Sequence, residues 1–226
     1  MKLSEKIDFQ NVEELTRKII AQKITPQRFS LEVSAKEAVN AVQAAMSAEV
    51  AFRKKELILD DATKTHIQQV AKWLTDKEGK MGLLMLGLCG NGKTTLMRSI
   101  ARLVEYVTEA TSGYSYRTTM HVYSAKEIAR MCVSSENERE EFKKLSSVKM
   151  LGIDDLGEEP KEIMNYGMIF TPLTDLILER YNRQLTTIVT TNLTKKQLIE
   201  KYGSRVYDRF KEMFEVIPFT NASYRK

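Results

Sequence analysis

Gly87-Leu88-Cys89-Gly90-Asn91-Gly92-Lys93-Thr94 is the stretch that decides how the rest of this 226-residue chain is interpreted. Its spacing matches G-x-x-x-x-G-K-[ST], the pattern of a P-loop that wraps phosphate groups. The glycines let the backbone turn tightly, so that successive N–H groups point at phosphate oxygens. Lys93 supplies positive charge for the β and γ phosphates, and the Thr94 hydroxyl supplies a ligand for Mg²⁺.

The segments on either side of this loop favour the same interpretation. Before it, Gly82-Leu83-Leu84-Met85-Leu86 is a short apolar run typical of a buried parallel strand. After it, apolar residues recur at helical spacing, namely Leu96, Ile100, Leu103, Val104 and Val107. A glycine turn between two core elements, with a lysine by chance, is the competing interpretation. The order strand, loop, helix favours the P-loop, whose nucleotide contacts we assign to Gly87, Cys89, Gly90, Asn91, Gly92, Lys93, Thr94 and Thr95.

The composition is that of a globular protein, with 29% charged and 42% hydrophobic residues. No apolar run approaches the roughly 18 residues of a membrane span, and Met1–Lys6 lacks a secretory apolar region. Cys89 and Cys132 are too few for a disulfide framework or a four-cysteine zinc site. We therefore expect no membrane association and a reducing, cytoplasmic location. The net charge of +5 permits nucleic-acid binding without establishing it.

Residues 1–55 are expected to form a small helical N-terminal region, and residues 56–226 the main domain. One apolar stripe consists of Val12, Leu15, Ile19 and Ile20. A long alanine-rich segment, predicted helical, follows the break at Thr25-Pro26 and runs from Ser34 to Leu57. Such segments either pack on the main domain or offer an apolar face to a partner, and the pattern alone does not separate the two.

The main domain alternates predicted strands with predicted helices. Beyond the P-loop strand, the strands are expected at residues 120–123, 148–153, 185–191 and 214–219. Helices are expected at 61–74, 137–145, 173–182 and 204–213, and two further helices begin at the capping boxes Ser124/Glu127 and Thr194/Gln197. This alternation predicts an α/β fold whose mostly parallel sheet is covered on both faces.

Two acidic residues and one amide end two of these strands. The apolar strand ending at Ile153 continues into Asp154 and Asp155, which is what a P-loop ATPase needs beside its phosphate loop. Asp154 would hold Mg²⁺, and Asp155 would orient and polarise the attacking water. Asn192, at the tip of the strand 185–191, could reach the γ-phosphate or the water. The competing interpretations are a turn made by two carboxylates and, for the asparagine, an Asx turn or helix cap.

Arg205 and Arg209 are four residues apart and therefore share a helix face. Two arginines placed in this way are suited to clamping phosphate. The competing interpretation is a surface ion pair with the neighbouring Asp208.

Together these motifs resemble AAA+ ATPases. The order is the P-loop, Ile153-Asp154-Asp155-Leu156-Gly157, Thr190-Thr191-Asn192-Leu193, and Gly203-Ser204-Arg205 with Asp208-Arg209. More narrowly, the chain is similar to the DnaC/DnaI helicase loaders and the IstB transposition helper ATPases. The closing Ala222-Ser223-Tyr224-Arg225 resembles the Ser-(Phe/Tyr)-Arg ending of that subfamily. The resemblance covers about Leu57 to Lys226.

The resemblance implies an AAA+ core with a five-stranded parallel sheet in the order 5-1-4-3-2. It implies that Asn192 is the sensor-1 residue and Arg205 an arginine finger for the γ-phosphate of a neighbouring subunit, which requires a homo-oligomer. Arg209 matches the second arginine of the same box, and Arg225 is an accessory nucleotide or interface sensor. Too few residues follow Arg209 for the separate helical lid of many AAA+ proteins, so we expect none. Asp155 replaces the glutamate of many AAA+ motors, which favours a slow switch.

The function implied is that of an ATP- and Mg²⁺-dependent helicase loader. It would assemble on single-stranded DNA and deliver a replicative DnaB-type helicase through its N-terminal helices, with ATP hydrolysis as a switch. Tyr114, Tyr116 and Arg117 are candidates for DNA contact by stacking and charge. Two alternatives stay open: an IstB-like helper ATPase assembling on duplex DNA, and a nucleotide-dependent scaffold with little hydrolysis. The asparagine-tipped strand and the Arg205 box disfavour a small-molecule kinase.

Overall fold

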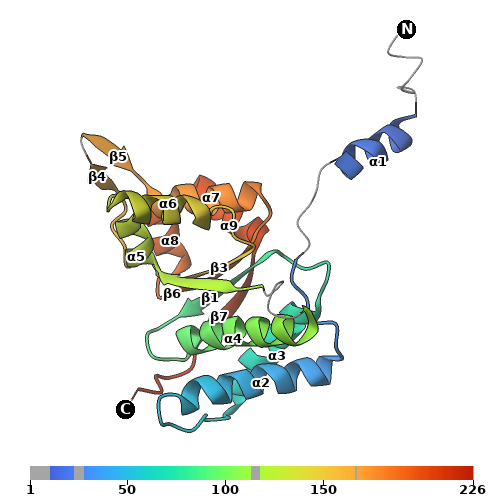
Figure 1. Cartoon of the computed structure of the whole chain (residues 1–226). Coiled ribbons are helices and arrows are strands. Elements are labelled where there is room, and N and C mark those ends of the chain that lie inside the picture. The colour runs from blue at the N-terminus through green and yellow to red at the C-terminus, as the bar shows by residue number, and fades with distance from the viewer. Residues whose placement is uncertain (1–10, 23–27, 113–117, 166, 226) are drawn as a thin grey trace.

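A parallel five-stranded sheet organises the computed structural model, which describes residues 11–22, 28–112, 118–165 and 167–225 (Figure 1). In spatial order its strands are β2 (Met120–Ser124), β3 (Met150–Leu156), β6 (Thr186–Thr191), β1 (Gly82–Gly87) and β7 (Phe214–Phe219). Numbered one to five along the chain and read from β7 to β2, these strands have the order 5-1-4-3-2. The predicted sheet and strand order are therefore confirmed.

Strand β1 lies between β6 and β7 and carries the P-loop at its carboxyl end. Leu83 pairs with Ile188 of β6, and Met85 pairs with Ile217 of β7, all in parallel register. The first four residues of β1 are buried, as expected for a parallel strand covered on both faces. Since all five strands run the same way, their carboxyl ends meet at one edge of the sheet.

Two groups of helices cover the two faces of the sheet (Figure 1). On one face lie α2 (Ala35–Ala51), α3 (Asp61–Thr75) and α4 (Lys93–Ser112). On the other lie α5 (Ala125–Met131), α6 (Glu136–Leu145), α7 (Pro172–Asn182), α8 (Lys195–Tyr202) and α9 (Ser204–Met213). Each group forms its own apolar cluster with the side chains of the sheet.

Helix α2 packs on the main domain. Its Ala38, Val42 and Met46 are buried in the cluster formed with α3 and α4. The helix starts at a capping box in which the Ser34 N–H donates to Glu37 Oε2 at 2.9 Å. It ends at Ala51, so the prediction of a helix reaching Leu57 is wrong. The chain leaves the helix through Lys54, whose φ of 57° lies in the left-handed region.

Helix α1 (Val12–Gln22) stands apart from the other elements in Figure 1. Its side chains Val12, Ile19 and Ile20 are 70%, 57% and 63% exposed. The predicted stripe therefore exists on a helix, and it faces solvent in this structure.

A hairpin of β4 (Ile163–Asn165) and β5 (Met168–Phe170), which follows β3 and precedes α7 along the chain, projects at the upper left of Figure 1 and was not predicted. Its strands have three residues each, shorter than the runs from which strands are recognised.

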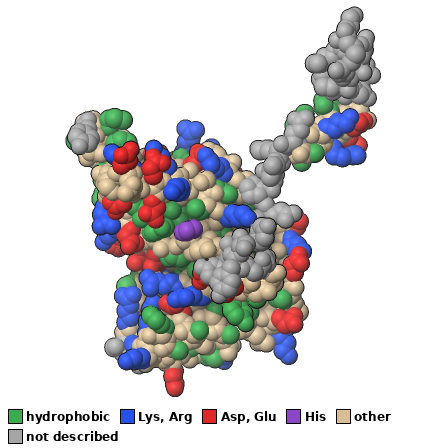
Figure 2. All heavy atoms as spheres, viewed as in Figure 1, with side chains coloured by type: hydrophobic (Ala, Val, Ile, Leu, Met, Phe, Trp, Pro, Cys, Tyr) green, Lys and Arg blue, Asp and Glu red, His purple; other side chains and the backbone are tan. Residues whose placement is uncertain are grey.

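The surface view shows acidic side chains gathered over α5 and α6 and basic side chains over α4 (Figure 2). Tyr114, Tyr116 and Arg117, the candidates for DNA contact, lie outside the described residues. Within the residues that the structure describes, no helix is long and apolar enough to cross a membrane.

Candidate nucleotide-binding site

A cavity of about 590 Å³ opens at the carboxyl edge of the sheet, where β1, β3 and β6 end. This volume lies within the usual range for small-molecule sites. One end is polar and formed by the P-loop, Asp154, Asp155 and Asn192. The rest of the lining includes the apolar side chains of Met46, Val50, Leu57 and Ile58 and the ring of Tyr224, together with the charged Arg53, Lys55 and Glu56. The cavity therefore offers surroundings for a charged group and for a flat apolar one.

The P-loop turns sharply at two glycines. Gly90 and Gly92 have φ values of 83° and 101°, a region that side chains disfavour. A Cβ at Gly90 would also lie 2.1 Å from Ser223 Oγ, so a larger residue would displace the end of the chain. Gly87 does not line the cavity; it lies against the Phe219 carbonyl at the end of β7. The predicted loop residues from Cys89 to Thr95 do line it.

Lys93 begins α4 and is 4% exposed. Its Nζ donates to the carbonyls of Gly87 and Leu88, both at 2.7 Å, and to Asn192 Oδ1 at 2.9 Å. Burial lowers the pKa of Lys93, while the negative charge of Asp155 opposes that change. The ammonium group is thus held by oxygens at the point where the loop and β6 converge, beside the polar end of the cavity.

Thr94 and Asp154, the residues predicted to hold Mg²⁺, lie in direct contact. Thr94 Oγ1 donates to Asp154 Oδ1 at 2.9 Å. The same carboxylate oxygen accepts a second hydrogen bond, at 2.6 Å, from Oγ1 of Thr190 on β6. Asp154 is 7% exposed, and Thr190 is fully buried. Two hydroxyls from different elements therefore fix the orientation of this carboxylate.

Asp155 adopts a backbone conformation that is rare for residues other than glycine, with φ at 54°. Its N–H donates to Thr190 Oγ1 at 2.8 Å, so one hydroxyl holds both acids. The pKa of Asp155 is raised, first by burial and second by the neighbouring Asp154 charge. A carboxylate with a raised pKa binds a proton more readily, which suits a group that polarises water.

Asn192 lies at the end of β6, against the cavity. Its side-chain oxygen accepts from Lys93, as described above. The helix that follows is capped by Thr194 rather than by Asn192, so the interpretation of this asparagine as a helix cap is wrong. The structure thus brings Lys93, Thr94, Asp154, Asp155 and Asn192 together at one edge of the sheet.

The final residues of the chain form one wall of this site. The Tyr224 N–H donates to the Gly90 carbonyl at 2.9 Å, and Arg225 Nη1 lies 3.3 Å from Cys89 Sγ. The Tyr224 hydroxyl donates to the Asp60 carboxylate, with oxygens at 2.9 and 2.8 Å, at the start of α3. Arg225, predicted as an accessory residue, lines the cavity.

Arg205 and Arg209 lie outside the cavity, on α9. Arg205 is exposed, and Arg209 Nη1 donates to the Arg205 carbonyl at 3.3 Å. Asp208 pairs with Lys211 at 2.7 Å, which lowers the pKa of Asp208. The structure therefore gives no support to an ion pair of Asp208 with either arginine.

Thr190 and Tyr224 belong to two of the sequence motifs, which predict no contact for either residue. Thr190 precedes the asparagine by two residues on a strand, so its side chain shares that residue's face. This spacing was an available signal for a position close to the two acids. The partner of the Tyr224 hydroxyl is 164 residues away along the chain, and no sequence signal points to it.

The residues present fit a magnesium–nucleoside triphosphate. The left-handed glycines and the start of α4 direct backbone N–H groups to the polar end of the cavity, where a phosphate chain would lie. Lys93 would hold phosphate oxygens, and Thr94 with Asp154 offers the oxygen ligands that Mg²⁺ prefers. The apolar side chains of the lining would contact a base.

No protein-family model and no curated protein matches the chain. Solved structures do match. The DnaC helicase loader superposes with a TM-score of 0.54 at 21% identity, covering 71% of this chain and 92% of that one. DnaI gives 0.57 at 20% identity, covering 82% and 93%. A candidate primosome component from Streptococcus pyogenes serotype M3 gives 0.55 at 19% identity, covering 81% and 99%. The chain therefore shares the fold of these three structures.

Proposed function

We propose that the protein is an ATP-dependent helicase loader whose catalytic site is completed between two subunits. The observation that supports this most is the arrangement at the carboxyl edge of the sheet. Lys93, the two acids and Asn192 converge on one cavity, whereas Arg205 faces solvent on α9. Arg53, Arg98 and Arg225 line the cavity but Arg205 does not, so Arg205 would act on the nucleotide of another subunit.

In this proposal each side chain has one task. ATP would supply the phosphoryl group, and Mg²⁺ would neutralise part of its charge. Lys93 holds phosphate oxygens, and Asn192 orients Lys93 and the attacking water. Asp154 and Thr94 bind the metal. Asp155 orients and polarises that water, and its raised pKa favours this role. Its shorter side chain, compared with glutamate, makes hydrolysis slow and suited to a switch.

The partners proposed are single-stranded DNA, a replicative DnaB-type helicase and further copies of the same chain, all in the cytoplasm. Helix α1 is the candidate helicase contact, because its apolar stripe is exposed whereas α2 is used in packing. The division at residue 55 is retained as a proposal, with partner binding assigned to α1. The net charge of +5 favours contact with a nucleic-acid backbone.

Hydrolysis is tested with the purified wild-type chain and two variants. Lys93→Ala is expected to lose nucleotide binding or turnover. Arg205→Ala is expected to bind nucleotide as the wild type does and to lose the rise in turnover that accompanies assembly. Mixing Arg205→Ala with Lys93→Ala restores activity if one subunit supplies the arginine and the other the loop. Full stimulated turnover by Arg205→Ala alone would contradict the trans arginine.

The scaffold alternative is tested with Asp155→Ala. If the wild type and this variant show the same near-zero turnover with DNA present, hydrolysis is not the task of the protein.

The partner is tested with helix α1. Replacing Ile19 and Ile20 by aspartate is expected to abolish capture of a hexameric DnaB-type helicase, while Arg17→Ala on the same helix serves as the control. Filaments on duplex DNA that need ATP, together with no helicase capture by the wild type, would favour the IstB-like helper instead.

A further inference from the structure

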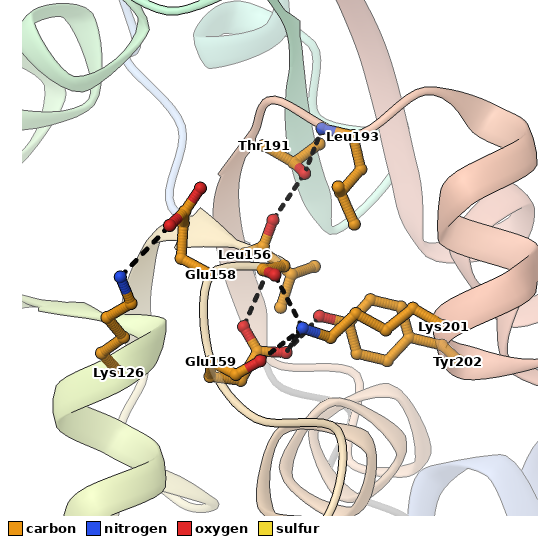
Figure 3. Close-up of polar contacts among 9 residues, drawn as sticks. Lys126, Leu156, Glu158, Glu159, Thr191, Leu193, Lys201 and Tyr202 are labelled. Atoms are coloured by element: carbon orange, nitrogen blue, oxygen red, sulfur yellow. Dashed lines mark hydrogen bonds and ion pairs between the residues drawn. The ribbon is translucent and has the colours of Figure 1, made fainter.

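The segment that follows the acidic strand is tied to the end of helix α8 by a buried polar cluster (Figure 3). The cluster consists of Gly157, Glu159, Lys201 and Tyr202. Gly157 and Glu159 lie two and four residues beyond Asp155, in the turn that leaves β3. Lys201 and Tyr202 are the last two residues of α8. The cluster therefore joins two segments that are about 40 residues apart along the chain.

Glu159 is the centre of the cluster and is 4% exposed. Its carboxylate accepts from the Gly157 N–H at 2.8 Å and from the Tyr202 hydroxyl. Burial and the adjacent Glu159 charge raise the pKa of Tyr202, so the phenol keeps its proton and donates it. A buried carboxylate is stable only with such partners, and each partner is therefore held in place by it.

The Lys201 side chain binds backbone carbonyls of the same turn. Its Nζ donates to the Gly157 carbonyl at 2.7 Å and to the Glu159 carbonyl, and it pairs with the Glu159 carboxylate at 3.3 Å. The Lys201 side chain is 17% exposed. One ammonium group thus fixes the path of the chain between residues 157 and 159 relative to α8.

A second connection runs beside the first. Thr191 Oγ1, on β6, donates to the Leu156 carbonyl at 2.6 Å, and the Leu193 N–H donates to Thr191 Oγ1 at 3.1 Å (Figure 3). Gly157 also lies directly against Leu193, because a Cβ there would be 2.5 Å from that side chain. The turn after Asp155 and the segment after Asn192 therefore cannot shift independently.

The end of α8 leads directly to Arg205. Gly203, with φ at 86°, makes the turn between α8 and α9, and Arg205 is the second residue of α9. The Tyr202 ring, at the end of α8, packs near the Phe210 ring of α9, with 6.1 Å between ring centres. A displacement of the turn at residues 155–159 would thus be carried through Lys201 and Tyr202 to the position of Arg205.

We propose that Glu159, Lys201 and Tyr202 are positioning residues that couple the nucleotide site of one subunit to the arginine which that subunit offers to its neighbour. The proposal rests on the proposed function, since it needs a nucleotide at Asp155 and a trans role for Arg205. In this arrangement the nucleotide bound beside Asp155 sets the orientation of Arg205. Successive subunits of an assembly then bind and hydrolyse nucleotide in a coupled manner.

If the cluster only stabilised the position of α8, the expected results would differ. It would contribute to folding stability alone, and its loss would not change how the Arg205 segment responds to nucleotide. The cluster has a close comparison within the same turn: Glu158 pairs with Lys126 at 3.2 Å, and both side chains are more than half exposed. That pair contacts α5 instead of α8 and serves as the matched control.

The test uses the full chain carrying Lys201→Met, Tyr202→Phe or, as control, Lys126→Met. Methionine retains most of the aliphatic length of Lys201, and phenylalanine retains the ring packing of Tyr202, so both variants are expected to fold. Nucleotide affinity, measured with a fluorescent ATP analogue, should remain within about twofold of the wild type because no cavity residue changes. Turnover stimulated by assembly should fall by about tenfold or more in Lys201→Met, since three contacts are lost.

The second readout is amide hydrogen exchange with a non-hydrolysable ATP analogue, which requires no catalysis. In the wild type and in Lys126→Met, the analogue should slow exchange in residues 155–159 and in 203–206. In Lys201→Met and Tyr202→Phe it should slow exchange only in 155–159. Wild-type stimulation and protection at 203–206 in both cluster variants would overturn the proposal, even if their stability falls. A wild-type chain that binds no nucleotide would instead refute the proposed function, and the coupling with it.

Discussion

Replacing Thr190 by valine removes the hydroxyl that holds both acids without changing the shape of the side chain. Thr190 Oγ1 donates to Asp154 Oδ1 at 2.6 Å and accepts from the Asp155 N–H at 2.8 Å. Thr190 is fully buried, so water cannot replace the missing hydroxyl without a rearrangement. We expect Thr190→Val to lower both the stability of the fold and the metal-dependent activity.

The magnitude follows from the two contacts. The bond to the carboxylate is charge-assisted and contributes about 1.5–3 kcal/mol, and an unsatisfied buried N–H costs about 1–3 kcal/mol. The two contacts share one atom and are not additive, so we expect a loss of roughly 3 kcal/mol in the free energy of unfolding. Because Asp154 and Asp155 also lose their orientation, turnover should fall by about 10- to 100-fold, corresponding to roughly 1.4–2.7 kcal/mol in the barrier.

The assay combines urea unfolding with ATP turnover measured against Mg²⁺ concentration. Thr187→Val is the matched control, since Thr187 is also fully buried on β6. Its hydroxyl accepts from Arg180 Nε at 2.9 Å and donates to the Leu185 carbonyl at 3.0 Å, far from the acids. Thr187→Val should lose comparable stability while its Mg²⁺ requirement stays that of the wild type.

The reasoning would be refuted by equal Mg²⁺ requirements and equal turnover in Thr190→Val and the wild type under conditions where both are folded. The two acids would then be held by the backbone of β3 and, for Asp154, by the Thr94 hydroxyl. A parallel loss of turnover in Thr187→Val would also refute it, since general loosening of β6 would explain both variants.

Three further substitutions test other parts of the structure. Asp155→Asn should abolish turnover and raise the urea midpoint at pH 7–8, because the raised pKa of Asp155 means that its ionised form destabilises the fold. This gain in stability should shrink as the pH falls through that pKa and the wild-type acid is protonated, and a gain that is independent of pH would contradict the linkage. Arg180→Met should lower the free energy of unfolding by about 3 kcal/mol or more, because the fully buried guanidinium makes four hydrogen bonds and stays charged, since burial lowers its pKa only to about 9. Unchanged urea unfolding would show that the strand and loop carbonyls find other donors. Tyr224→Phe removes the hydroxyl bonded to Asp60 and should weaken nucleotide binding about 3- to 10-fold, the effect of roughly 1 kcal/mol, because the end of the chain then holds the P-loop less firmly. Titration with a fluorescent ATP analogue measures this affinity, and a wild-type value would show that the main-chain bond from Tyr224 to the loop suffices.

Much of the fold was predictable because the signals are local. Helix α9 and strand β7 begin and end at the predicted residues, 204–213 and 214–219. Gly203 separates α8 from α9, and the change of hydrophobic period after Met213 marks the start of the strand. The sheet order came from the resemblance, and the end of α2 was misplaced because Lys54 carries no sequence signal for its left-handed turn.

The site was predictable by residue type but not by contact. Side chains that end parallel strands must meet at one edge, which places Asp154 near Asn192 from sequence alone. Which hydroxyl bonds which carboxylate depends on register between strands, and Thr190 reaches Asp154 because β6 lies beside β3 with Ile153 opposite Val189. The cluster around Glu159 depends in the same way on where α8 ends against that sheet.

The charge in the cavity bears on the proposed second subunit. The lining contains three acidic side chains, Glu56, Asp154 and Asp155, and five basic ones, Arg53, Lys55, Lys93, Arg98 and Arg225. A triphosphate carries more negative charge than one Mg²⁺ cancels, and charge on its terminal oxygens must still be stabilised during transfer. Burial is the first cause of the raised pKa of Asp155 and the Asp154 charge is the second, so this end of the cavity is poorly solvated and charge there must be stabilised by protein groups. In the proposed assembly, that stabilisation includes the exposed Arg205 of a neighbouring copy, because Arg205 does not line the cavity of its own chain.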